Sequence, residues 1–292
     1  MERKQIKEIS EYTLREIESQ ISLWKIYKST LNLRNLRLHE GYPITIPEDV
    51  KSIDLSGNSY LPKLPTELEV LYMNDTFIEE LTSFPPNLKE LYIGHNYIKR
   101  IENLPDSLEV LHIPGSYSIT KLPPLPSNLK KLVLNFSHHV EELPDLPKNL
   151  EELLVQNVPI KVLPHLPKTL TKLNIWSTGV TELSYLPDTL EALNIMNTKI
   201  SFIPNRPKNI KSLLCYDCSS LQVQISNKDS IQSYFKKWIP IWEEEQKKKA
   251  IAACKSVKED LMIATWHPKR VDWWMDEEEK NEWLQFGPLL PV

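Results

Sequence analysis

Three cysteines are the residues of this chain whose type and spacing first suggest chemistry. Cys215 and Cys218 are separated by two residues, the spacing of half a zinc site. Such a site needs two further ligands, and both cysteines occupy positions of the sequence repeat described below. We therefore interpret them as buried core residues. The odd cysteine count, completed by Cys254, argues against a disulfide framework and favours a reducing, cytoplasmic environment.

Histidines and carboxylates also form groups that could carry chemistry. His138 and His139 lie in an expanded repeat without further metal ligands beside them, and we interpret them as part of a surface loop. The acidic run from Asp276 to Glu279 reads as a solvated helix face. No paired-carboxylate, triad or phosphate-loop arrangement stands out. The sequence therefore predicts no catalytic residue, no metal site and no cofactor.

A repeat of about twenty residues organises most of the chain. The pattern L-x-x-L-x-[LIVM] begins at Leu68, Leu88, Leu108, Leu129, Leu150, Leu170, Leu190 and, with isoleucine, at Ile210. These starting points are 20 or 21 residues apart, and weaker copies begin at Leu33 and Val50. Such a regular period is the sequence signature of a solenoid.

Each repeat also carries a small, mostly polar position, then aliphatic residues, then a proline-led segment. The small position is occupied by Asn58, Thr76, Asn96, Ser116, Ser137, Val158, Thr178, Thr198 and Cys218. We expect its side chains to bond backbone groups where the chain turns. The chain has 23 prolines and only 6 glycines, so we expect its turns to be built differently from glycine turns.

The repeat predicts a solenoid of stacked coils. L-x-L alternation makes a short strand with leucines on one face, and stacking buries those leucines in a continuous core. Twenty residues leave no room for a full helix on the back of a coil, and proline favours an extended return arm. The fold class is therefore an α/β repeat solenoid with short parallel concave strands, extended proline-rich convex arms and helical caps at both ends.

The pattern L-x-x-L-x-I-x-x-[NTS]-x-I-x-x-L-P-x-L-P resembles the leucine-rich repeat. Its proline-rich, 20-residue form is similar to the bacterial effector subclass of the YopM and IpaH type. This resemblance covers residues 33–223, about ten coils. The IpaH likeness raises the possibility of a ubiquitin-ligase role, because those enzymes carry a large separate domain with a nucleophilic cysteine. Only about 70 residues follow the repeats here, and their one cysteine, Cys254, lies on an apolar helical stripe where a thiol is normally inert.

The two ends of the chain differ from the repeats. Residues 1–32 carry an apolar helical stripe that includes Ile17 and Trp24, and they are predicted to form an N-terminal helical cap. Residues 224–292 contain six of the eight tryptophans and are predicted to form a C-terminal Trp-rich helical domain. Within it, WHPKRVDWW resembles a C-terminal motif of proteins from giant DNA viruses of the marseillevirus type.

Charge and hydropathy narrow the partner classes. The net charge is -4 with a pI of about 6.0, which does not favour nucleic acid. The N-terminus lacks an apolar signal-peptide core, and no run of 18 apolar residues predicts membrane insertion. We expect no small-molecule substrate either.

The residues between the strand leucines should face solvent on the concave side. They form a central column, Asp54, Tyr72, Tyr92, His112, Val133, Leu154, Asn174, Asn194 and Leu214. A second column holds Ser56, Asn74, Gly94, Pro114, Asn135, Gln156, Trp176, Met196 and Tyr216. One charge in these eighteen positions, with exposed aromatic side chains, resembles a protein-binding patch.

The sequence therefore predicts a non-enzymatic module that binds a host or viral protein through its concave face. The candidate binding residues are Tyr72, Tyr92, His112, Asn174, Trp176, Asn194, Met196 and Tyr216. An alternative is a structural component of a viral particle, which rests on the viral-like C-terminal segment. A third possibility is the substrate-recognition part of a ubiquitin-ligase system.

Overall fold

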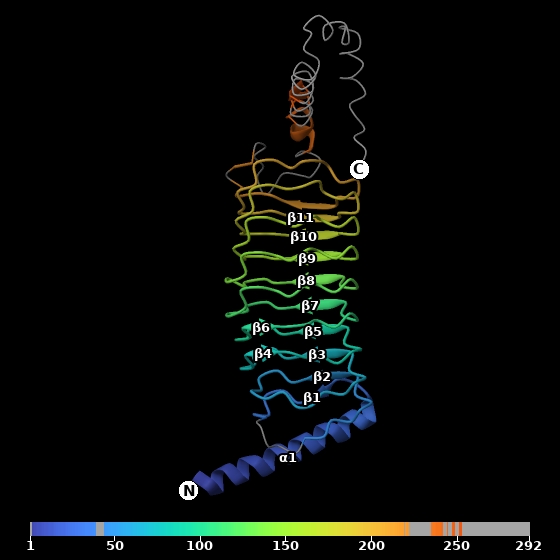
Figure 1. Cartoon of the computed structure of the whole chain (residues 1–292), viewed down its shortest axis with the longest axis vertical. Coiled ribbons are helices and arrows are strands. Elements are labelled where there is room, and N and C mark those ends of the chain that lie inside the picture. The colour runs from blue at the N-terminus through green and yellow to red at the C-terminus, as the bar shows by residue number, and fades with distance from the viewer. Residues whose placement is uncertain are drawn as a thin grey trace, which may run out of the picture. The chain divides into compact units, whose positions relative to one another are not determined.

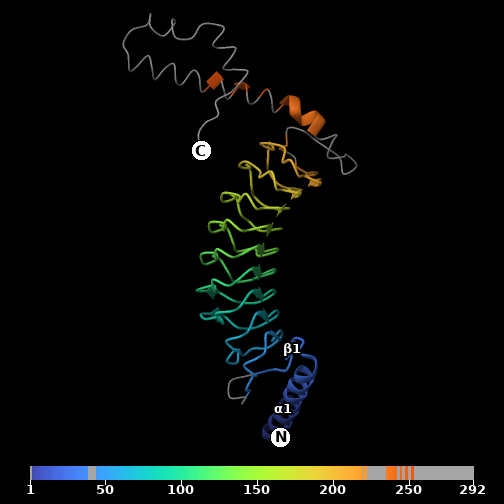
Figure 2. The same cartoon turned by 90° about the vertical axis from the view of Figure 1, so that its right-hand side faces the viewer.

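The computed structural model describes residues 2–38, 44–218, 220–221, 235–241, 244, 247–248 and 251–252, with side chains from Tyr12 onward (Figures 1 and 2). The chain divides into two compact units, Met1–Lys228 and Asp229–Val292. The predicted WHPKRVDWW segment, Cys254 and the acidic run at Asp276 lie outside the described residues. Predictions about them therefore stay predictions.

The first unit is built on a ten-stranded parallel sheet in which each coil contributes one strand (Figure 1). The strands are β1 (Leu31–Asn32), β2 (Ser52–Asp54), β3 (Val70–Tyr72), β5 (Glu90–Tyr92), β7 (Val110–His112), β8 (Lys131–Val133), β9 (Glu152–Leu154), β10 (Lys172–Asn174), β11 (Ala192–Asn194) and β12 (Ser212–Leu214). They follow one another in that order, and equivalent residues of successive coils are paired in register. The predicted parallel solenoid is confirmed.

Each three-residue strand buries its middle residue and turns its flanking residues outward, as the period of two in an extended chain requires. Leu91 and Leu153 are fully buried in this way. Figure 2 shows the stack of coils curving with the strands on its inner side. The residues that flank the buried leucines therefore lie on the concave face.

A left-handed residue follows every strand of the sheet. Positive φ occurs at Asn35, Gly57, Asp75, His95, Gly115, Phe136, Asn157, Ser177, Asn197 and Asp217. We expected these glycine-poor turns to differ from glycine turns, and for the backbone this expectation is wrong, because the turns have the positive φ that glycine usually provides. Only the residue type changes, because Asn and Asp tolerate this region. In most of these turns the backbone N–H donates to a carbonyl of the next coil, which extends the ladder past the strand, as in His95 to Pro114 at 2.8 Å.

The small side chains form a buried row beside these turns, and several bond backbone as predicted, whereas the hydroxyls of Thr76 and Ser116 have no hydrogen-bond partner among the described residues. The Thr178 hydroxyl donates to the Ile175 carbonyl at 2.9 Å, and the Thr198 hydroxyl donates to that of Ile195 at 2.7 Å. Cys218 Sγ donates to the same Ile195 carbonyl at 2.9 Å. These bonds satisfy backbone groups that the turn leaves without a partner.

Extended arms close the coils on the convex side. Between Leu31 and Leu221, the described residues contain no helix, and the arms include only the short parallel pair β4 (Glu80–Leu81) and β6 (Arg100–Ile101). A proline carbonyl ends each of eight arms by accepting the N–H of the next coil's first apolar residue, as in Leu150 N–H to the Pro147 carbonyl at 3.1 Å. The extended proline-rich return that the sequence predicts is thus present.

Helix α1 (Glu2–Tyr27) lies against the first strand, β1. Its buried residues include Ile17 and Trp24, two members of the predicted apolar stripe. Lys28 follows the end of the helix, and its Nζ atom lies 4.0 Å from the Trp24 ring centroid and 2.9 Å from Asp49 Oδ2. In the second unit, residues 235–241 are helical, and Phe235 and Trp238 pack edge to face at 5.4 Å.

Candidate binding surface on the strand side

The central column is a continuous row of side chains across the sheet. Strand pairing aligns Asn32, Asp54, Tyr72, Tyr92, His112, Val133, Leu154, Asn174, Asn194 and Leu214 in register. Tyr72, Tyr92 and His112 form one group of candidates. Buried Val133 and half-buried Leu154 separate them from the group around Asn174 and Asn194.

The first group is an aromatic stack. The rings of Tyr72 and Tyr92 are stacked with centroids 4.6 Å apart, and His112 is tilted against Tyr92 at 5.4 Å. The Tyr92 hydroxyl donates to Glu90 at 2.8 Å. Burial, followed by the Glu90 hydrogen bond, raises the pKa of Tyr92, so the phenol stays protonated and acts as a donor.

His112 completes this stack as a neutral imidazole. Burial lowers its pKa, and the nearby charges of Lys131 and His95 act in the same direction. Its Nδ1 atom has no hydrogen-bond partner within the described part of the chain. The stack thus offers apolar ring surface with few polar atoms, which suits a protein contact better than an ionic one.

The second group contains two asparagines that fix the backbone of their neighbours. Asn174 Oδ1 accepts the backbone N–H of Trp176 at 3.2 Å, and Asn194 Oδ1 accepts that of Met196 at 3.1 Å. Each side chain thereby forms a local turn with its own backbone. Both asparagines therefore position the backbone of Trp176 and Met196. The sequence had predicted them only as contact residues.

Trp176, Met196 and Tyr216 follow one another in the second column. A backbone bond connects the coils of Trp176 and Met196 here, since the Ser177 N–H donates to the Met196 carbonyl at 2.9 Å. All three side chains are half-buried. They mark a mainly apolar area at one position of three successive coils, next to the two asparagines.

The strand side carries more charge than the two predicted columns suggested. The first strand position, which those columns omit, holds Glu90, Lys131, Glu152 and Lys172. Glu152 pairs with Lys131 at 2.9 Å and with Lys172 at 2.5 Å, which links three strands. Charge is therefore present on this face, but much of it is neutralised within the sheet.

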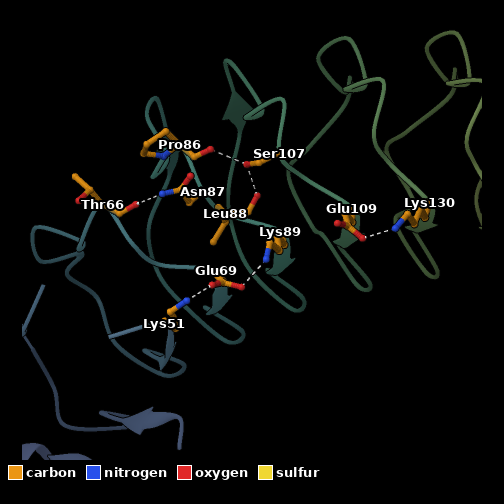
Figure 3. Close-up of polar contacts among 10 residues, drawn as sticks. All are labelled: Lys51, Thr66, Glu69, Pro86, Asn87, Leu88, Lys89, Ser107, Glu109 and Lys130. Atoms are coloured by element: carbon orange, nitrogen blue, oxygen red, sulfur yellow. Dashed lines mark hydrogen bonds and ion pairs between the residues drawn. The ribbon is translucent and has the colours of Figure 1, made fainter. Parts of the chain in front are cut away.

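A second row of charges runs along the residues that precede β2, β3, β5, β7 and β8, as Figure 3 shows. Glu69 pairs with Lys51 at 2.7 Å and with Lys89 at 2.6 Å, and Glu109 pairs with Lys130 at 2.6 Å. Figure 3 also shows Ser107 donating to the carbonyls of Pro86 and Leu88, both at 2.7 Å. Such bonds between successive coils hold the strand side in one register.

The double pairing of Glu69 makes stability depend on pH. Lys51 and Lys89 lower its pKa from 4.5 to about 2. A lowered carboxyl pKa means that the stabilisation is complete above about pH 5 and is lost as the pH falls through 2. We expect Glu69→Gln to reduce the free energy of unfolding by about 1 kcal/mol at pH 7. In urea titrations the deficit should be much smaller near pH 2 than at pH 7.

Glu142→Gln is the matched control for that prediction, because Glu142 is exposed and has no ion pair among the described residues. Its unfolding free energy should stay within about 0.5 kcal/mol of the wild type at every pH. A Glu69→Gln deficit that is the same at pH 7 and pH 2 would contradict the role of the two lysines.

The structure contains a second row of aromatic side chains that the sequence analysis did not predict. Phe77, Tyr97 and Tyr117 occupy the position after the small polar residue, with ring centroids 6.1 Å and 5.5 Å apart. Their exposed fractions are 67%, 50% and 50%. The signal was available in the sequence as three aromatic residues 20 residues apart, outside the strand columns.

The cysteine pair is part of the core. Cys215 and Cys218 are both buried and free, and burial raises the pKa of Cys215 to about 12. No group of three potential metal ligands occurs within the described ranges, and His138 and His139 are exposed. The core interpretation of the cysteines and the surface position of the histidines are confirmed.

As for membranes, none of the described helices combines the length and apolar character that crossing a bilayer requires.

Comparison with solved structures finds the same architecture elsewhere. YopM from Yersinia enterocolitica WA-314 matches with a TM-score of 0.51 and 27% identity over 63% of this chain and 45% of that one. This chain thus spans less than half of that structure. YopM from Yersinia pestis, described as a leucine-rich effector protein, matches with a TM-score of 0.43 and 26% identity, over 68% of this chain and 71% of that chain.

The comparison with protein families matches a shorter part of the chain. Residues 80–116 match the family profile of the FNIP repeat. No curated protein matches the sequence. The chain therefore has a leucine-rich repeat fold similar to that of YopM, a repeat fold of the kind that presents extended concave surfaces for binding.

Proposed function

We propose that this protein is a non-enzymatic, cytoplasmic interaction module that binds another protein through the concave strand side. The observation that carries the proposal is the in-register arrangement of the two candidate groups. One group is the stack of Tyr72, Tyr92 and His112, and the other lies around Trp176 and Met196. Half-buried aromatic residues of this kind provide much of the energy in protein interfaces.

The paired charges favour a protein partner over a nucleic acid. The lysines of the strand side, such as Lys131, Lys172 and Lys89, contact carboxylates within the sheet. A nucleic acid needs unpaired Lys and Arg side chains in line with its phosphates. A protein surface with apolar side chains matches the two candidate groups better. The partner we propose is therefore a host or viral protein.

Charge substitution in each group tests this function. Trp176→Glu places a charge in the apolar area, and Tyr92→Lys breaks the aromatic stack while leaving a partner for Glu90. We expect each variant to lose at least 90% of partner capture, which corresponds to about 1.4 kcal/mol of binding free energy. Capture is measured with the full chain as bait and quantitative mass spectrometry against wild type.

Val162→Glu is the matched control, because Val162 is 75% exposed and lies in the convex arm after β9. It should retain every wild-type partner, and all three variants should melt within about 3 °C of wild type. If Trp176→Glu and Tyr92→Lys both capture the wild-type set, the concave-face proposal is wrong.

A further inference from the structure

A polar hollow lies at the N-terminal end of the central column, next to the aromatic stack. It has a volume of about 380 Å³ and is lined by Ser29, Thr30, Asn32, Asp54 and Tyr72. Ser29 and Thr30 belong to the connection between α1 and β1, while the other three residues come from β1, β2 and β3. The hollow therefore lies where the connection after α1 meets the first three coils.

Tyr72 presents an aromatic face to this hollow. One face of its ring is covered by Tyr92, with centroids 4.6 Å apart and an interplanar angle of 15°. Its neighbour in the opposite direction along the column is Asp54, a much smaller side chain that is paired with it in register. Among the described residues no second aromatic ring stacks on the other face of Tyr72, and an aromatic face attracts cations.

Asp54 supplies a carboxylate beside that ring. Its Oδ1 atom accepts the backbone N–H of Ser56 at 2.9 Å, and within the described residues the carboxylate has no ion pair. The nearby cations have other partners: Arg34 lies 3.8 Å from Asp75, Lys28 lies 2.9 Å from Asp49, and Lys51 lies 2.7 Å from Glu69. A carboxylate therefore lines the hollow without an ion-pair partner in the described part of the chain.

The other wall adds neutral oxygen acceptors. The hydroxyls of Thr30 and Ser52 share a hydrogen bond of 2.9 Å, and Asn32 Oδ1 accepts the Arg34 backbone N–H at 3.1 Å. These contacts hold the wall in place, and each oxygen retains a second lone pair. A carboxylate, an aromatic face and several acceptors form a set that matches a ligand rich in N–H donors.

We infer that this hollow receives an arginine side chain of the partner protein, with the guanidinium over Tyr72 and hydrogen bonded to Asp54. Arginine fits better than lysine because its planar guanidinium stacks on a ring and carries five donors for the surrounding acceptors. The inference rests on the proposed function, since it adds a specificity site at one end of the same concave surface.

The test uses the full chain, labelled with nitrogen-15, and Nα-acetyl-arginine methylamide as the probe. Two-dimensional NMR follows the backbone signals during titration, and the citrulline analogue has nearly the same shape without the charge. We expect saturable shifts at Asn32, Asp54 and Tyr72 with a Kd in about the millimolar range. The citrulline probe should bind at least tenfold more weakly, and the lysine analogue should lie between the two.

Asp54→Asn is the decisive variant because its amide oxygen can still accept the Ser56 N–H while the charge is lost. It should weaken arginine binding at least tenfold and leave distant signals unchanged. Tyr72→Leu should do the same by removing the ring. Glu142→Gln, an exposed carboxylate in the arm between β8 and β9, is the matched control and should change the Kd less than twofold.

Three results would overturn the inference: equal binding of arginine and citrulline, shifts centred away from the hollow, or unchanged binding by Asp54→Asn. The proposed function fails separately. If the probe does not bind but Trp176→Glu abolishes capture, the hollow is not an arginine site and the concave interface stands. If the probe binds as expected but capture survives Trp176→Glu and Tyr92→Lys, the interface proposal fails and the arginine site stands.

Discussion

Leu153→Ala is expected to lower the free energy of unfolding by about 2–5 kcal/mol, the usual cost of truncating a buried leucine. Leu153 is the middle residue of β9, is fully buried and is paired in register with Leu132 and Leu173. Coils on both sides confine it, so the cavity left by alanine can collapse only partly. Since each coil contacts only its neighbours, a defect in a central coil weakens two interfaces.

Urea unfolding followed by circular dichroism measures this effect, and Leu154→Ala is the matched control. Leu154 is the next residue of the same strand, but it is half-buried and points to the concave side. Its truncation should cost less than about 1 kcal/mol. Equal costs at the two positions would mean that Leu153 does not contribute to the core as its burial indicates.

Asn58→Ala is expected to lower the free energy of unfolding by about 2–4 kcal/mol, because it leaves several buried backbone groups without a partner. Asn58 Nδ2 donates to the carbonyls of Leu33 and Leu55 at 2.8 and 2.9 Å, while its Oδ1 accepts the Leu38 N–H at 3.1 Å. One side chain thus connects two successive coils. Alanine removes all of these bonds together.

Thr198→Val is the comparison, since the Thr198 hydroxyl makes one strong hydrogen bond, to the Ile195 carbonyl at 2.7 Å. It should cost about 1 kcal/mol. Hydrogen exchange provides a second measurement, because the Leu38 amide should lose protection in Asn58→Ala before the rest of the sheet does. A cost for Asn58→Ala no larger than that of Thr198→Val would contradict the connecting role.

The repeat made most of the solenoid predictable. The spacing of Leu153 and Leu173 determines the pairing of β9 with β10, because equal coils bring equal positions side by side. The small residues Thr178 and Thr198 were predicted to bond backbone, and they do. The left-handed turns were misjudged, since Asp75 and even Phe136 adopt a conformation that glycine usually provides. Regular hydrogen bonding to the next coil outweighs the local preference of these residues.

The candidate surface was predictable as a set of columns but not as a set of contacts. Strand alternation indicates that Tyr72 and Tyr92 face outward, yet their 4.6 Å stacking depends on the spacing of adjacent strands. In the same way, the acceptor role of Asn174 toward the Trp176 N–H requires a particular turn. The pairing of Glu152 with two lysines was missed because the first strand position had been left out of the columns.

The sequence by itself determined the coil length, the buried leucines, the register and the side of the solenoid on which each residue lies. All of these follow from a fixed period and the alternation of an extended strand. Only the tertiary structure decided which outward-facing residues pair with one another. Glu69 is held between two lysines, whereas Asp54 faces a hollow beside Tyr72. The reason is that these contacts depend on side-chain geometry between neighbouring coils and on the junction with α1, which a linear pattern does not encode.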